Sequence, residues 1–331
     1  MRWLVVMAFE RAESIGMDLA SELEALGHEV RRFAYRRHNV LYKNKSTKAT
    51  YQRLIARRLV TRAAAWRPDV VLVAKGSALP APVLADLRAR TGARLVNVFP
   101  DNPLWMMDFE SIEAYDVFFT KESYALDQLR LAGLENVHYL APWCVPSDHH
   151  PVELHENEEA ALRGVVALVG AWYPYRERFL AAIADYPVRV WGPGWTRCRD
   201  SRVRAMVRGG AVRGRAKLAI YSGATLSLNV HHPMNDIVGV NNRTFELAAA
   251  AACQLVNLKE DLGALFKPGQ EVVGFGDLAE LKQQMDYYLA RPDEARAIGE
   301  NARRRALAEH TARHRIEEII AVLDQRFGLA S

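Results

Sequence analysis

Cysteine is scarce in this sequence, with 3 among 331 residues. Cys144, Cys198 and Cys253 stand far apart and none has metal-binding spacing, so neither a disulfide framework nor a zinc site is expected. Long apolar runs are also missing, because Glu10 and Glu13 interrupt the apolar N-terminus and no run approaches the roughly 20 residues of a membrane span. These absences predict a cytoplasmic protein without a membrane-spanning segment or bound metal.

Acidic residues are absent from Arg31 to Arg67, a stretch with twelve lysines and arginines, although the formal net charge of the chain is only +5. Such a basic block favours phosphate-rich partners such as anionic lipid headgroups, a lipid diphosphate, an acidic glycan or nucleic acid. A solvated basic face is an equally good interpretation. We expect Arg53, Arg57 and Arg58 to meet an anionic acceptor or the inner face of a membrane. Nucleic acid is the less favoured partner, although aromatic residues interleave the charges: Phe33, Tyr35, Tyr42 and Tyr51.

Apolar strands alternate with helical patterns along the whole chain. Six strands are predicted in the first half, at Trp3–Met7, Glu29–Phe33, Asp69–Ala74, Ala93–Phe99, Val117–Thr120 and Val137–Leu140. The same pattern restarts in the second half, at Val165–Val169, Val188–Trp191, Leu226–Val230 and Gln254–Leu258. Alternation of this kind predicts an α/β protein built on doubly wound parallel sheets.

The segment from Ala141 to Glu159 interrupts this alternation with two prolines and an acidic run. We therefore expect a linker there, between a first Rossmann-like domain at residues 1–150 and a second at residues 151–310. A terminal helix is expected at residues 311–331.

One strand and the helix after it carry the most informative pattern. The strand ends in Asn229 and His231, and the helix opens on Asn242 and Arg243, where uncapped backbone N–H groups and a guanidinium attract an anion. One turn later, Glu246 is placed to accept hydrogen bonds from a sugar diol. A site for an anion next to a site for a sugar diol predicts that a nucleotide binds here.

Other candidate ligand contacts follow neighbouring strands, because ligands of open α/β sheets bind beyond the carboxyl ends of the strands. Gly170, Trp191 and Gly192 stand at such ends, and Arg176 opens the next helix, where a guanidinium can fork onto a diphosphate. Gly170 could instead serve only the turn, and Arg176 could pair with Glu177 at the surface. No GxGxxG fingerprint is present, which disfavours a dinucleotide-dependent dehydrogenase.

Two carboxylates are candidates for a general base in the first half. Asp101 directly follows a predicted strand and could deprotonate an acceptor hydroxyl, although an Asx turn before Pro103 would also explain it. Glu10 competes for the same role. His231 and His232 do not suggest a metal site, since adjacent strand residues point to opposite faces.

Several motifs resemble, in their order and spacing, those of the CgeB-like (spore maturation protein B type) glycosyltransferases of GT-B architecture. They are Val165–Arg176, Val190–Trp195, Leu226–His231, Arg243–Glu246, Phe266–Glu271 and His310–Arg315. The likeness continues more loosely through Arg67–Asp69, Asp101–Pro103 and the region of Gly133. It implies two Rossmann-like domains facing a central cleft, with C-terminal helices that can cross back to the first domain.

The resemblance also implies a function: transfer of a sugar from a nucleotide diphosphate donor, without an obligatory metal or other cofactor, to an acceptor of a surface glycan, lipid-linked or protein substrate. Glu246 would hold the donor ribose, Asn242 and Arg243 the diphosphate, and the first domain the acceptor. Gly170, Arg176, Trp191 and Gly192 would frame the donor from the other loops. Val238 occupies the position of the first glutamate in the better-known retaining pattern, which leaves the stereochemistry open. If configuration is inverted, Asp101 is the expected base.

Two other functions remain compatible with the sequence. A sugar-nucleotide epimerase of the same fold would need paired acid and base groups but no acceptor. A non-catalytic module that binds nucleotide or nucleic acid would use the basic block.

Overall fold

The computed structural model describes residues 1–36 and 44–329. The chain divides into two compact units, each described here by itself. Unit 1 consists of Met1–Pro142, Met234–Val238 and Ala312–Ser331, and unit 2 of Trp143–Pro233 and Gly239–Thr311. Among the described residues, no helix combines the length and apolar character needed to cross a membrane.

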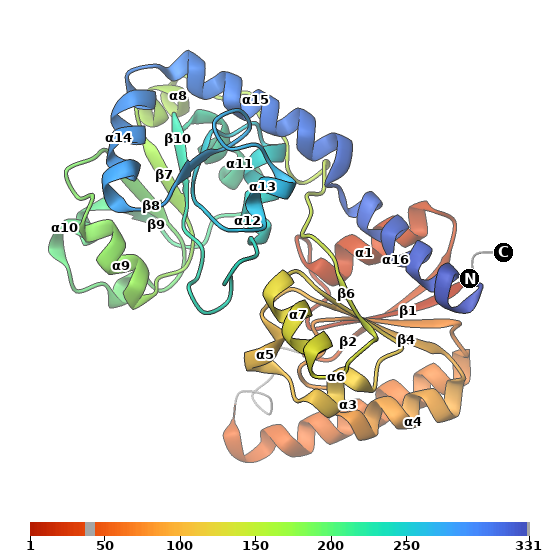
Figure 1. Cartoon of the computed structure of the whole chain (residues 1–331). Coiled ribbons are helices and arrows are strands. Elements are labelled where there is room, and N and C mark those ends of the chain that lie inside the picture. Colours follow the sequence, from red (N-terminus) through yellow and green to blue (C-terminus); the bar gives the residue numbers. More distant parts are fainter. Residues whose placement is uncertain (37–43, 330–331) are drawn as a thin grey trace. The chain divides into compact units, whose positions relative to one another are not determined.

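Unit 1 is built on a parallel sheet whose six strands, within the described residues, follow the order β2-β1-β3-β4-β5-β6. The strands are β1 (Arg2–Met7), β2 (Glu29–Ala34), β3 (Val70–Ala74), β4 (Arg94–Phe99), β5 (Val117–Thr120) and β6 (Val137–Tyr139). Every residue of β3 is buried, because helices cover both faces of the sheet (Figure 1). These helices are α1 (Ile15–Ala25), α3 (Lys45–Trp66), α4 (Ala81–Thr91), α5 (Pro103–Met106), α6 (Phe109–Glu113), α7 (Ser123–Leu131) and α16 (Ala312–Phe327).

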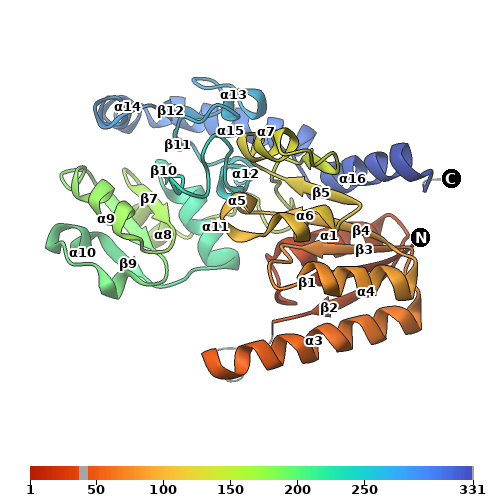
Figure 2. The same cartoon turned by 60° about the horizontal axis from the view of Figure 1, so that its bottom comes forward.

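Helix α16 is the last helix in the described part of the chain, and it belongs to unit 1. It packs beside α1, on the face of the sheet opposite α3 and α4 (Figures 1 and 2). Ile316, Ile319 and Leu323 are fully buried, and the Arg315 guanidinium donates to the carbonyl of Ala141 at 2.8 Å. The chain therefore crosses back to its first domain at its end, as the resemblance implies.

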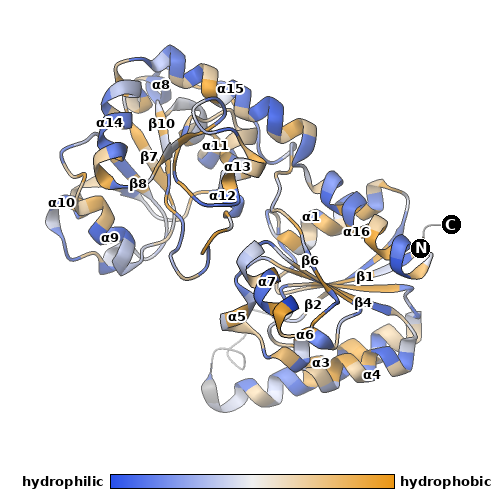
Figure 3. Cartoon of the chain, viewed as in Figure 1, coloured by the Kyte–Doolittle hydropathy of each residue, from blue (hydrophilic) through white to orange (hydrophobic). Residues whose placement is uncertain are grey.

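Unit 2 repeats the architecture with a second parallel sheet, of order β12-β11-β10-β7-β8-β9. Its strands are β7 (Val166–Val169), β8 (Val188–Trp191), β9 (Val207–Gly209), β10 (Leu226–Asn229), β11 (Gln254–Asn257) and β12 (Val273–Phe275). Apolar residues concentrate along the strands of both units, whereas the helices are mixed (Figure 3). The helices of unit 2 are α8 (Glu156–Leu162), α9 (Pro174–Ala181), the 3-10 turn η1 (Trp195–Arg197), α10 (Ser201–Met206), α11 (Gly214–Gly223), α12 (Asn242–Ala249), α13 (Leu262–Leu265), α14 (Leu278–Leu289) and α15 (Pro292–Glu309).

The predicted α/β class is confirmed, and the differences are local. Helix α8 begins inside the predicted linker, where the Glu158 carboxylate accepts the His155 amide at 3.0 Å and so caps the helix. All four residues of strand β10 are buried. Strands β9 and β12 have only three residues each, which is too short for a pattern to indicate them.

Candidate functional site

The carboxyl ends of β7, β8 and β10 bring together most of the residues predicted to bind the donor. Arg176 and Arg243 both approach Gly170, which follows β7. A Cβ atom on Gly170 would lie 2.8 Å from Nη1 of Arg176 and 3.7 Å from Nη2 of Arg243. Two guanidinium groups thus converge on one glycine of unit 2, an arrangement that suits an anion held close to the backbone.

Arg176 is held rigidly at this edge. It is 7% exposed, and it donates hydrogen bonds to the carbonyls of Ala171 at 2.6 Å and Val230 at 3.2 Å. The alternative that Arg176 pairs with Glu177 at the surface is wrong, because the Glu177 carboxylate accepts from the Trp172 indole at 2.7 Å and from loop amides instead. Arg176 therefore ties the loop after β7 to the loop after β10.

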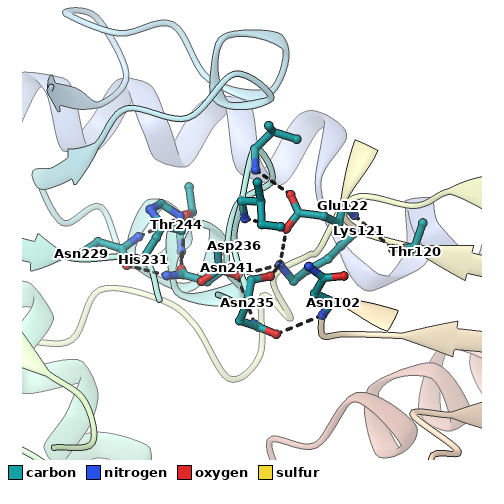
Figure 4. Close-up of polar contacts among 12 residues, drawn as sticks. Asn102, Thr120, Lys121, Glu122, Asn229, His231, Asn235, Asp236, Asn241 and Thr244 are labelled. Carbon is teal, nitrogen blue, oxygen red and sulfur yellow. Dashed lines mark hydrogen bonds and ion pairs between the residues drawn. The ribbon is translucent and has the colours of Figure 1, made fainter. Parts of the chain in front are cut away.

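Asn229 positions the helix that carries Arg243. Its amide donates to Thr244 Oγ1 at 3.0 Å and accepts from Asn241 at 3.0 Å (Figure 4). It also donates to Gln254 Oε1 at 3.2 Å. Asn229 is fully buried, so this network fixes the start of α12 against β10 and β11.

The beginning of α12 is partly capped, contrary to the expectation from sequence. The Asn241 side chain accepts from the Thr244 amide at 3.1 Å. Within residues 1–36 and 44–329, no acceptor is found for the amides of Asn242 and Arg243. These two N–H groups and the helix dipole add to the positive potential beside the Arg243 guanidinium.

Glu246 lies one turn into α12, next to a lysine that the sequence did not single out. Lys217 Nζ is 3.5 Å from Glu246 Oε2, and the Glu246 side chain is 24% exposed. Burial acts to raise the pKa of Glu246, but Lys217, His149 and Arg243 together outweigh burial and place this pKa below its usual value. Glu246 is therefore ionised at neutral pH, and both of its carboxylate oxygens can accept hydrogen bonds from hydroxyl groups. The only sequence signal for Lys217 was a lysine amid an apolar helical stretch.

His231 is oriented by β11. Its amide and its ring Nδ1 both lie within hydrogen-bonding distance of Asn257 Oδ1, at 2.8 and 2.9 Å, so Nδ1 carries the proton when this oxygen accepts. In the part of the chain that the structure describes, no group of three or more His, Cys, Asp or Glu side chains could hold a metal ion.

Gly192 packs directly on Gly170. A Cβ atom at Gly192 would lie 2.0 Å from the carbonyl oxygen of Gly170, and the φ angle of Gly192 is +150°. The amide of Gly170 donates to the carbonyl of Trp191 at 2.7 Å, and the Trp195 indole donates to the carbonyl of Gly170 at 2.9 Å. Trp191, Gly192 and Trp195 thus hold the backbone of Gly170 in place.

Gly192→Ala is expected to destabilise the fold by about 1–3 kcal/mol and to weaken donor binding, because the new methyl group must displace Gly170. Chemical denaturation and nucleotide titration measure the two effects. Gly210→Ala is the matched control, since Gly210 has no neighbour within 4 Å of an added Cβ and no positive φ. Equal stability of the two variants would contradict the tight contact at Gly192.

Asp101 of unit 1 is paired with a cation. Its Oδ2 atom lies 2.5 Å from Nζ of Lys75, and the two side chains are 25% and 27% exposed. The Asx turn expected at Asp101 is formed by Asn102, whose side chain accepts from the Leu104 amide at 3.1 Å and caps α5. The Asp101 carboxylate is therefore not used in helix capping, and it remains at the carboxyl end of β4.

The basic block separates into different environments. Arg53 and Gly76 line one cavity of unit 1, whereas Glu10 and Arg58 line another. Arg57 is exposed and lines neither of these cavities. The block's residues 37–43, with Arg37, Tyr42 and Lys43, lie outside the described residues.

A short loop completes unit 1 through contacts that the sequence did not indicate. Lys121 Nζ is 2.6 Å from Asp236 Oδ1, and both side chains are almost fully buried. The Glu122 carboxylate accepts the amides of Ile237 at 2.9 Å and Val238 at 2.8 Å (Figure 4). Met234–Val238, predicted only as part of a polar turn, is therefore anchored in unit 1 by buried charges.

Comparisons with known proteins agree with this architecture. A family model described as "Glycosyl transferase-like" matches residues 176–321. The spore protein CgeB of Bacillus subtilis (strain 168) is 24% identical over 247 residues, which cover 70% of this chain and 75% of CgeB.

Solved structures share the fold at low identity. Sucrose-phosphate synthase from Thermosynechococcus elongatus has a TM-score of 0.74 at 14% identity, with all of both chains covered. Anabaena HepE in complex with UDP-glucose has a TM-score of 0.67 at 11% identity, with 98% of this chain and 100% of HepE covered. The family model and the relative support a CgeB-like glycosyltransferase, and the solved structures show the GT-B fold.

Proposed function

We propose that unit 2 binds a nucleoside diphosphate sugar and that the sugar is transferred, without a metal, to a hydroxyl or similar group of an acceptor bound by unit 1. The observation that carries this proposal is the convergence of Arg176 and Arg243 on Gly170, beside the ionised Glu246. The guanidiniums suit the diphosphate, and the carboxylate suits the ribose diol. Anabaena HepE, which shares the fold, has been crystallised with UDP-glucose, which supports this type of donor.

When the acceptor oxygen attacks the anomeric carbon, the bond from this carbon to the β-phosphate oxygen breaks, and negative charge develops on that oxygen of the departing nucleoside diphosphate. Arg243 and the amides that begin α12 are fixed in place before the reaction by the Asn229 network. Hydrogen-bond donors that are fixed in advance stabilise developing negative charge without having to reorganise during the reaction. The chain's own cations can therefore take the part that a divalent metal plays in other transferases.

Asp101 is proposed as the base that accepts the proton of the acceptor hydroxyl. This role requires inversion at the anomeric carbon, with the hydroxyl attacking from the face opposite the leaving group. We expect a product of inverted configuration, which ¹H NMR of the anomeric proton determines directly. A product of retained configuration would remove the base role from Asp101.

The acceptor is proposed to be a surface glycan, a lipid-linked or a protein substrate in the cytoplasm or at the inner face of the membrane. The three cysteines, Cys144, Cys198 and Cys253, are buried and lie outside any disulfide, which suits a reducing compartment. Exposed Arg53 and Arg58, which line cavities of unit 1, suit an anionic acceptor or membrane surface.

A thermal-shift panel of nucleoside diphosphates tests the donor proposal. A ligand at about 100 times its dissociation constant adds about 2.7 kcal/mol to stability, so one base should stand out from the others. Incubation with the matching sugar nucleotide alone then separates the alternatives. An epimerised sugar without any acceptor would indicate an epimerase, whereas binding without turnover of any acceptor mixture would indicate a binding module.

A further inference from the structure

A cavity of about 350 Å³ in unit 1 is lined by five arginines and one glutamate, and it is named here the arginine pocket. Its charged members are Arg11, Arg32, Arg36, Arg58, Arg62 and Glu10. The pocket lies beyond the carboxyl ends of β1 and β2, which end at Met7 and Ala34. Ligands of parallel α/β sheets bind at this edge.

Helix α3 supplies two of the arginines. Arg58 and Arg62 are four residues apart and therefore share one face of the helix, whereas Arg57 points elsewhere and does not line the pocket. The Arg62 guanidinium lies over the ring of Phe33, 5.9 Å from its centroid, and that of Arg11 lies 5.5 Å from the centroid of Phe9. Aromatic faces of this kind hold a guanidinium in a defined orientation.

The positive charge of the pocket is incompletely balanced. Arg32 pairs with Glu24 at 2.5 Å, and among the described residues Glu10 is the one carboxylate that lines the pocket. Arg58 and Arg62 form no ion pair with any carboxylate in residues 1–36 and 44–329. Five guanidiniums around one cavity repel one another, and this repulsion is relieved when an anion enters.

We propose that the arginine pocket binds a phosphate or diphosphate group of the acceptor. Guanidinium groups form paired hydrogen bonds to phosphate oxygens, and several of them around one pocket suit an anion that carries more than one charge. The proposal rests on the proposed function, because it takes unit 1 as the acceptor side. It narrows the acceptor to a phosphorylated compound.

Titration calorimetry with inorganic pyrophosphate tests this assignment in the full-length protein. We expect two classes of site in the wild type, one removed by Arg243→Ala and the other by Arg58→Ala/Arg62→Ala. In the Arg243→Ala background, the double substitution should weaken pyrophosphate binding by at least about tenfold, because charge-assisted hydrogen bonds are lost. Arg57→Ala, which removes one neighbouring positive charge that does not line the pocket, should leave this binding unchanged.

The outcomes separate the two proposals. If Arg243→Ala removes a class of pyrophosphate site but Arg58→Ala/Arg62→Ala does not, the donor site stands and the arginine pocket is overturned. If Arg58→Ala/Arg62→Ala removes a class of site but Arg243→Ala does not, the arginine pocket stands and the donor site is overturned. Equal weakening of pyrophosphate binding by Arg57→Ala would show general attraction to a basic surface and would also overturn the arginine pocket.

Co-sedimentation with vesicles of equal parts phosphatidylcholine and phosphatidylglycerol tests whether the phosphate belongs to a lipid. Binding lost in Arg58→Ala/Arg62→Ala but kept in Arg57→Ala assigns the phosphate to a lipid, and absence of vesicle binding assigns it to a soluble compound.

Discussion

Arg243→Ala should lower the rate of glycosyl transfer by about 10²–10³-fold, which is the usual effect of removing one fixed hydrogen-bond donor that stabilises developing negative charge. Arg243 approaches Gly170 together with Arg176, but only Arg176 is engaged with the carbonyls of Ala171 and Val230. Loss of Arg243 should therefore remove charge stabilisation while the loops stay in place. Initial rates at saturating donor, together with an unchanged unfolding transition, measure the effect.

Arg208→Ala is the matched control, because Arg208 is an exposed arginine of unit 2 on β9. A rate for Arg243→Ala within about threefold of this control, a margin well below the usual effect of one such donor, would exclude Arg243 from the reaction.

Glu246→Gln should change nucleotide affinity in the same site in a different way from Arg243→Ala. Glu246 is proposed to hold the ribose, so its loss should weaken nucleoside monophosphate and diphosphate alike, whereas Arg243→Ala should weaken mainly the diphosphate. The pKa of Glu246 lies below its usual value, so the carboxylate stays charged as the pH falls from 7 to 6. The contribution of Glu246 to nucleotide affinity should therefore be constant over this range.

The fold was predictable from the sequence because parallel strands buried on both faces appear as short continuous apolar runs, as in β3. The edge that carries Gly170, Arg243 and Glu246 was predictable for a related reason, since strand ends in such a sheet meet at one side. Residues that act through distant partners gave no such signal. Lys217 contacts a carboxylate 29 positions away, and Lys121 contacts Asp236 across 115 positions.

Asn229 illustrates the same difference in another way. The sequence indicated a polar residue at the end of a strand, which fits a ligand contact and a structural role equally well. Only the positions of Asn241, Thr244 and Gln254 show that its amide is engaged in fixing α12. Local pattern thus predicted which residues lie at this edge, whereas the packing that holds them in place depends on tertiary structure.

Lys121→Met is expected to destabilise unit 1 by about 3–5 kcal/mol, because it leaves the Asp236 carboxylate buried without its cation. The side chains of Lys121 and Asp236 are 4% and 3% exposed, so water cannot replace the lost partner without opening the loop. Hydrogen exchange read at Val117–Thr120 and at residues 234–238 reports this loss within unit 1 and does not require two-state unfolding of the whole chain.

Lys121→Met/Asp236→Leu should recover most of the lost stability, because replacing a whole buried ion pair by apolar side chains is often neutral. Lys48→Met is the control for loss of a lysine, since Lys48 is exposed on α3. If Lys121→Met cost less than about 1 kcal/mol, the pair would behave like a surface ion pair. In that case the anchoring of Met234–Val238 would have to come from Glu122, which accepts the amides of Ile237 and Val238.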